Sequence, residues 1–77
     1  HHIALSYEST ADSSQQTSIG VMEVWDQEEV IASTKLMSDQ ASAVIKDLSV
    51  NGRSLSIHIR ISSGVVCRLQ SLRFTKH

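Results

Sequence analysis

Alternation of apolar and polar residues is clearest over residues 55–61, where every second side chain is aliphatic. A period of two places these side chains on one face of an extended chain, which is typical of a half-buried β-strand. The aliphatic positions are Leu55, Ile57, Ile59 and Ile61. Ile3, Leu5 and Tyr7 follow the same period and predict a short first strand.

Asn51-Gly52 precedes residues 55–61 and is the preferred two-residue turn of a β-hairpin, because both central residues need φ > 0. Val44, Leu48 and Val50 keep a period of two before the turn. The sequence therefore predicts a strand that leads into this turn and pairs with residues 55–61.

Residues 62–64, Ser-Ser-Gly, suit a three-residue hairpin loop with Gly64 in the left-handed conformation. Burial favours the register in which aliphatic side chains face one another. That register pairs Ile61 with Val65, Ile59 with Cys67 and Ile57 with Leu69. A bulge near residues 70–71 would then keep Leu72 and Phe74 on the same apolar face.

The remaining pattern completes a sheet. Residues 19–25 and 30–37 flank the polar residues 26–29 and are interpreted as another hairpin. Turn signals recur roughly every 11–12 residues, as in an antiparallel meander. We therefore expect an all-β fold, a small antiparallel meander of five to six short strands that forms an open barrel or a twisted sheet.

A helix is the alternative interpretation of the middle of the chain. Residues 26–49 contain neither proline nor glycine, and Ser38 could cap a helix. Helical spacing is kept by Val30, Thr34, Met37, Ala41, Val44 and Leu48. The alternative fold is α+β, with one helix around residues 39–48 packed on an antiparallel sheet.

The chain of 77 residues has room for a single small domain, in which residues 9–18 form a polar loop. His1, His2 and His77 resemble remnants of a purification tag, so we expect a fragment of a larger protein. One cysteine and the lack of a signal peptide favour an intracellular location. The apolar runs are too short to span a membrane.

Charge is divided along the chain. All eight acidic residues lie in residues 1–47, and five of the seven basic residues lie in residues 48–77. Such a division can be used internally, by pairing strands of opposite charge, or externally, as a basic surface for an acidic partner.

Four basic side chains form the candidate surface for an anionic partner: Arg53, His58, Arg60 and Arg68. The predicted register places His58 across from Arg68 on the face opposite the isoleucines, with Arg53 beside the turn. Guanidinium groups match phosphate geometry. Because no aromatic residue is expected on this face, base stacking has no platform and nucleic acid is not the expected partner.

Catalytic, cofactor and metal sites are not expected. His58 and Cys67 fall on opposite faces in the predicted register, and burial raises the pKa of a thiol and makes it unreactive. The sequence lacks zinc-ligand spacing, a calcium-binding loop, a nucleophile elbow and a glycine-rich phosphate loop. We therefore do not expect an enzyme.

These observations favour a non-catalytic protein–protein interaction or assembly domain that uses a sheet edge and an apolar surface. The expected partner is another protein chain, which includes a second copy in a homodimer. The alternative is a binding domain for an anionic ligand, such as an acidic protein, nucleic acid or phospholipid, on the basic sheet face.

Overall fold

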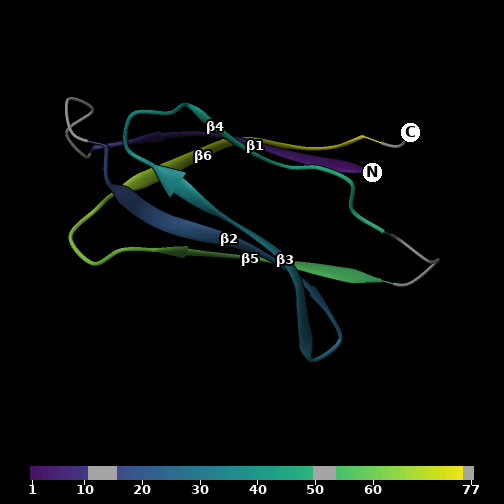
Figure 1. Cartoon of the computed structure of the whole chain (residues 1–77). Coiled ribbons are helices and arrows are strands. Elements are labelled where there is room, and N and C mark those ends of the chain that lie inside the picture. Colours follow the sequence, from purple (N-terminus) through teal and green to yellow (C-terminus); the bar gives the residue numbers. More distant parts are fainter. Residues whose placement is uncertain (11–15, 50–53, 76–77) are drawn as a thin grey trace.

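Six antiparallel strands make up the fold in a computed structural model that describes residues 1–10, 16–49 and 54–75. The strands are β1 (His2–Ser9), β2 (Ser18–Asp26), β3 (Glu29–Met37), β4 (Ser42–Ile45), β5 (Leu55–Ile61) and β6 (Cys67–Thr75). They form two three-stranded sheets with the orders β4-β1-β6 and β3-β2-β5 (Figure 1).

The all-β class with six antiparallel strands is confirmed, as two open sheets rather than a closed barrel. The α+β alternative is wrong: within residues 39–48 the chain forms strand β4, and the described residues contain no helix. Accordingly, no helix capable of crossing a membrane occurs in the described part of the chain.

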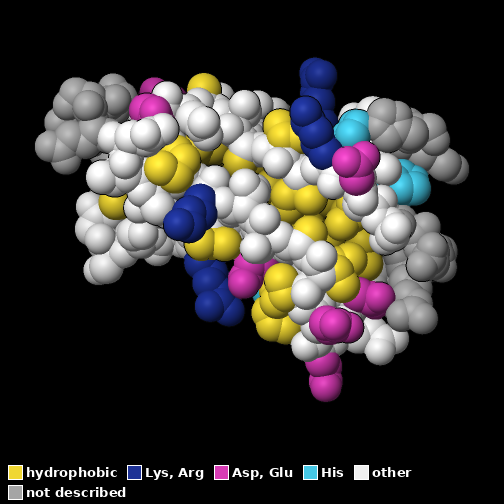
Figure 2. Space-filling model, viewed as in Figure 1, with side chains coloured by type: hydrophobic (Ala, Val, Ile, Leu, Met, Phe, Trp, Pro, Cys, Tyr) yellow, Lys and Arg dark blue, Asp and Glu magenta, His cyan; other side chains and the backbone are white. Residues whose placement is uncertain are grey.

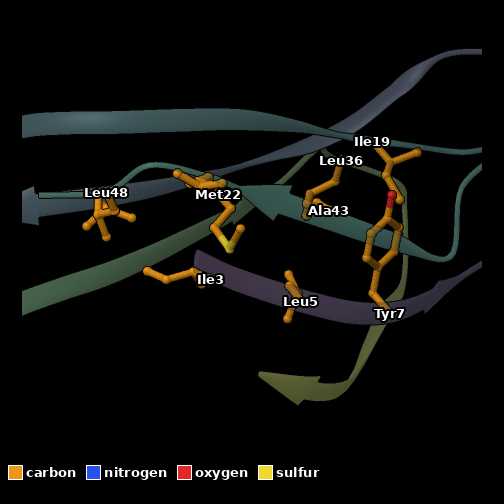
Figure 3. Packing of buried hydrophobic residues seen from close by; sticks show 10 residues of the cluster. Ile3, Leu5, Tyr7, Ile19, Met22, Leu36, Ala43 and Leu48 are labelled. Atoms are coloured by element: carbon orange, nitrogen blue, oxygen red, sulfur yellow. The ribbon is translucent and has the colours of Figure 1, made fainter. Parts of the chain in front are cut away.

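The core lies between the two sheets and follows the predicted alternation in β1, where Ile3, Leu5 and Tyr7 are buried. Figure 3 shows Tyr7 extending from β1 toward Ile19 and Leu36 of the other sheet. Both sheets supply the buried hydrophobic side chains, which are Ile3, Leu5, Tyr7, Ile19, Met22, Val24, Leu36, Ala43, Ile45 and Leu48. This arrangement is that of a small sandwich, in which inward-facing residues of two sheets form one core.

The predicted hairpin around residues 26–29 is confirmed. Strands β2 and β3 pair up to Asp26 and Glu29, which leaves a two-residue turn. Gln27 opens this turn with a φ of 56°, the left-handed conformation that two-residue hairpin turns require at their first central position.

The pairing predicted for residues 55–61 with residues 65–69 is wrong. Strand β5 pairs with β2, whereas β6 pairs with β1, so the two strands belong to different sheets. The connecting residues form a turn in which Val65 N–H donates to the Ser62 carbonyl at 3.2 Å and Gly64 has a φ of 83°. The left-handed glycine was predicted correctly, but it carries the chain from one sheet to the other (Figure 1).

The turn at Asn51-Gly52 lies outside the described residues. Its flanking strands, β4 and β5, belong to different sheets, so the predicted pairing across this turn is also wrong. Strand β4 buries Ala43 and Ile45 and exposes Val44, which reverses the predicted alternation. Asp47 has a φ of 58°, and this left-handed residue breaks the period between Val44 and the buried Leu48.

The predicted bulge in the last strand is confirmed. Ser6 pairs with Ser71 and Tyr7 pairs with Leu69, so Gln70 is the extra residue. The bulge restores the register, and Leu72 and Phe74 lie opposite the buried Leu5 and Ile3.

The two sheets come closest at the edge strands β3 and β4, and a tyrosine of the central strand β1 links them. The Tyr7 hydroxyl of β1 donates to the Met37 carbonyl of β3 at 2.9 Å and accepts from the Met37 N–H at 3.0 Å. Next to it, the Ser38 N–H donates to the Thr17 carbonyl at 2.8 Å, which extends the pairing of β2 with β3 within one sheet. The Tyr7 phenol is thus a direct link between the sheets.

Candidate functional site

Strand β6 exposes an apolar row on the face that points toward the core. The row consists of Leu69, Leu72 and Phe74, which are 49%, 48% and 53% exposed. Their partners across β1 are Tyr7, Leu5 and Ile3, each 2% exposed or less. The β6 apolar row is therefore in register with the core without being covered by it.

The uncovered side of the core extends to β5. The inward-facing side chains of this strand, Leu55, Ile57, Ile59 and Ile61, pack against the core but are only partly buried. Among the described residues, β5 and β6 are each the edge of their sheet, and the turn at residues 62–65 joins them. The two sheets hence contact each other along β3 and β4, whereas the core is incompletely covered on the side of β5 and β6.

The outward face of β6 is basic. Arg68 lies across from Glu8 of β1, and Arg73 lies across from Ala4. Both arginines are exposed. Strand β6 thus presents apolar side chains on one face, two guanidinium groups on the other, and an edge of backbone groups between them.

The four residues predicted to bind an anionic partner do not share one face. His58 and Arg60 are exposed on β5 in the sheet β3-β2-β5, whereas Arg68 is on the outward face of β6 in the other sheet. Since the core lies between the sheets, these outward faces point in opposite directions. Arg53 lies outside the described residues. The predicted placement of His58 across from Arg68 is wrong, because His58 pairs with Glu23.

Around Arg60 the outward face of β5 is partly neutralised. Arg60 Nε lies 3.3 Å from Glu23 Oε1, and the side chains are 71% and 18% exposed. A carboxylate so close to the guanidinium reduces the positive potential that an anionic ligand would meet.

An aromatic residue does lie on this face, contrary to the sequence-based expectation. The Trp25 ring stacks on the His58 ring, with centroids 5.1 Å apart and planes 21° apart. Strand β2 buries Met22 and Val24, so the alternation itself places Trp25 on the opposite, outward face. The period of two in β2 is thus the sequence signal that places Trp25 outside the core.

Cys67 packs partly buried against the core, as predicted, and burial raises the pKa of its thiol. Desolvation also raises the pKa of the buried Tyr7 phenol, assisted by the nearby Cys67 and Asp39 charges and opposed by the Met37 hydrogen bond. Neither group is activated for nucleophilic chemistry. In residues 1–10, 16–49 and 54–75, no three histidine, cysteine or carboxylate side chains gather as metal ligands would.

A cleft of about 440 Å³ opens between β3 and the segment that follows β4. Its lining residues are Asp26, Ile31, Ala32, Lys46, Asp47, Leu48 and Ser49. Figure 2 shows hydrophobic side chains gathered in the middle of the molecule with charged side chains around them. The sequence did not reveal this cleft, because it forms between one sheet and the segment that leaves the other sheet after β4.

Comparison with known proteins leaves the function to be argued from these residues. No protein-family model matches the sequence, and no curated protein or solved structure gives a significant match to the chain.

Proposed function

We propose that this chain is a protein–protein interaction domain whose contact surface is the β6 apolar row and the adjoining edge of the sheet. One observation carries the proposal: Leu69, Leu72 and Phe74 are about half exposed although they face the side of the sheet that forms the core. Grouped apolar side chains of this kind mark interaction surfaces, and an edge strand offers backbone groups for pairing.

The size of the chain supports the same conclusion. A domain of 77 residues buries little more than about 60% of its unfolded surface, so a partner that covers further apolar area adds useful stability. Covering Leu72 and Phe74 would complete a core that the two sheets close on one side only.

Sedimentation velocity over a wide range of protein concentration tests the proposal. We expect the isolated chain to associate with itself by apolar contact, because Leu69, Leu72 and Phe74 are about half exposed in the absence of another partner. Leu72→Ser should shift the association to at least about fivefold higher concentration, since a half-exposed leucine in a contact surface contributes on the order of 1 kcal/mol.

Val44→Ser is the matched control. Val44 is an aliphatic strand residue that is 44% exposed, close to the 48% of Leu72, but it lies outside the β6 apolar row. Association that responds equally to both substitutions, or to neither, would contradict the proposed surface.

A further inference from the structure

We infer that the partner of this surface is an extended segment with alternating acidic and apolar residues, which adds to β6 as a further strand of the sheet. The inference rests on the proposed function and names the chemistry of its partner. It follows from the two faces of β6: the inward face is apolar, the outward face carries Arg68 and Arg73, and both faces adjoin the same strand edge.

The inward face of β6 determines where the partner segment needs apolar residues. A strand added beside β6 places every second side chain on the core side of the sheet, next to Leu72 and Phe74. Aliphatic or aromatic residues at these positions would bury apolar area against Leu72 and Phe74, which are about half exposed.

The outward face of β6 determines where the partner segment needs acidic residues. The intervening side chains of the added strand would lie beside Arg68 and Arg73, both of which are exposed. The carboxylate of Glu8 lies across from Arg68 on β1, whereas Arg73 lies across from the uncharged Ala4. Acidic residues on the added strand would pair with these guanidinium groups, and basic ones would be repelled.

The bulge at Gln70 divides the edge of β6 into two regular segments, residues 67–69 with Arg68 and residues 71–75 with Arg73. Bulges and charges on an edge strand prevent indiscriminate pairing. On β6 these two features restrict the partner to a short strand of the opposite charge, because a basic or neutral strand lacks the compensating interaction.

The probe is a labelled nine-residue peptide, as long as β6, in which glutamate alternates with valine and leucine. Fluorescence anisotropy should show saturable binding to the chain that weakens as salt rises. A peptide with lysine in place of each glutamate should bind at least about tenfold more weakly. On peptide addition, hydrogen exchange of alternate backbone amides in Ser71–Thr75 should slow, because an added strand accepts their hydrogen bonds.

Variants of the chain locate the site. The double variant Arg68→Ser/Arg73→Ser should lower the affinity for the glutamate peptide by about tenfold, through lost charge pairing. Arg60→Ser removes an arginine from the other sheet, where it pairs with Glu23, and should change the affinity by less than about twofold. Equal loss in both arginine variants would indicate general electrostatic attraction and would overturn the inference.

The results separate this inference from the proposed function. If Leu72→Ser abolishes self-association but the glutamate and lysine peptides bind equally, or neither binds, the apolar row is a contact surface and the acidic strand is wrong. If Leu72→Ser affects neither self-association nor peptide binding, the β6 apolar row is not a contact surface. Both the proposed function and the inference are then wrong. Binding of the glutamate peptide without slowed exchange in Ser71–Thr75 would show that it does not add to the edge, which overturns the inference.

Discussion

Tyr7 joins the two sheets through a single oxygen atom. Its ring is part of the core, and its hydroxyl satisfies both the N–H and the carbonyl of Met37. Those backbone groups lie at the end of β3, the edge strand of the opposite sheet. The sequence indicated that Tyr7 is buried by its period with Ile3 and Leu5, but it gave no sign of the partner 30 residues away.

Tyr7→Phe should lower the free energy of unfolding by about 1–3 kcal/mol, because it leaves two buried backbone groups without a partner while keeping the ring. Urea denaturation measures this difference, and a loss below about 0.5 kcal/mol would show that water replaces the hydroxyl.

Two glycines illustrate how different constraints act on the strands and their connections. Gly64 adopts a φ of 83° in the turn between β5 and β6, and a Cβ there would meet nothing within 4 Å. Gly20 lies in β2, where a Cβ would overlap the backbone carbonyl of Arg60 on β5. The first position requires glycine for its conformation, and the second requires it for the close approach of two strands.

Gly64→Ala should therefore destabilise the chain by about 1–2 kcal/mol, the strain of a left-handed residue with a Cβ. Gly20→Ala should cost about 3 kcal/mol or more, because β2 and β5 must move apart. Chemical denaturation compares the two variants, each of which controls for the other since the substitution is identical. The reverse order of stability would contradict the strand contact at Gly20.

Alternation of apolar residues identified most of the strands but, apart from the β2–β3 hairpin, not which strands pair. A period of two shows which side chains share a face, and this was sufficient for β1, β2, β3, β5 and β6. Which strands pair depends on the direction in which a connection leads the chain. A left-handed glycine such as Gly64 is compatible both with a hairpin turn and with a turn that leads from one sheet to the other. Strand β4 has only four residues, too few for a reliable period.

The candidate site was predictable only in part. The bulge that turns Leu72 and Phe74 inward could be inferred from the change of period after Leu69. Their exposure could not, because it depends on the strands of the other sheet. The separation of Arg68 from His58 and Arg60 likewise follows from the strand pairing rather than from the local sequence.

For the whole molecule, the division of charge along the chain is used within the fold. The basic segment supplies β5 and β6, and each pairs with a strand of the acidic segment, β5 with β2 and β6 with β1. Glu23 contacts Arg60, and Glu8 lies across from Arg68. The first of the two uses considered from the sequence is thus realised for Arg60, whereas Arg73 lies across from the uncharged Ala4.

Alkaline pH should destabilise the whole molecule through two of its core groups. The folded state raises the pKa of Cys67 above 9.0 and that of Tyr7 above 10.0, so it favours their protonated forms. Each contribution is fully present below the ordinary pKa and is lost as pH rises through the raised folded value. Denaturation midpoints should therefore fall above pH 9.0, first through the thiol.

The double variant Tyr7→Phe/Cys67→Ser is the control for this pH dependence. The double variant should be less stable than the wild type at neutral pH. As pH rises above 9.0, however, its free energy of unfolding should fall less than that of the wild type. Equal slopes in the wild type and the double variant would assign the alkaline loss to other groups.

The passage of the chain from β5 to β6 between the sheets also determines when folding can be completed. Ile3 of the first strand pairs with Ile45 and with Phe74, so the centre of one sheet depends on residues from the middle and the end of the chain. Folding dominated by such distant pairings takes on the order of milliseconds to seconds. During synthesis, β1 precedes the other five strands described, and one of its edges stays unpaired until β6 has been made.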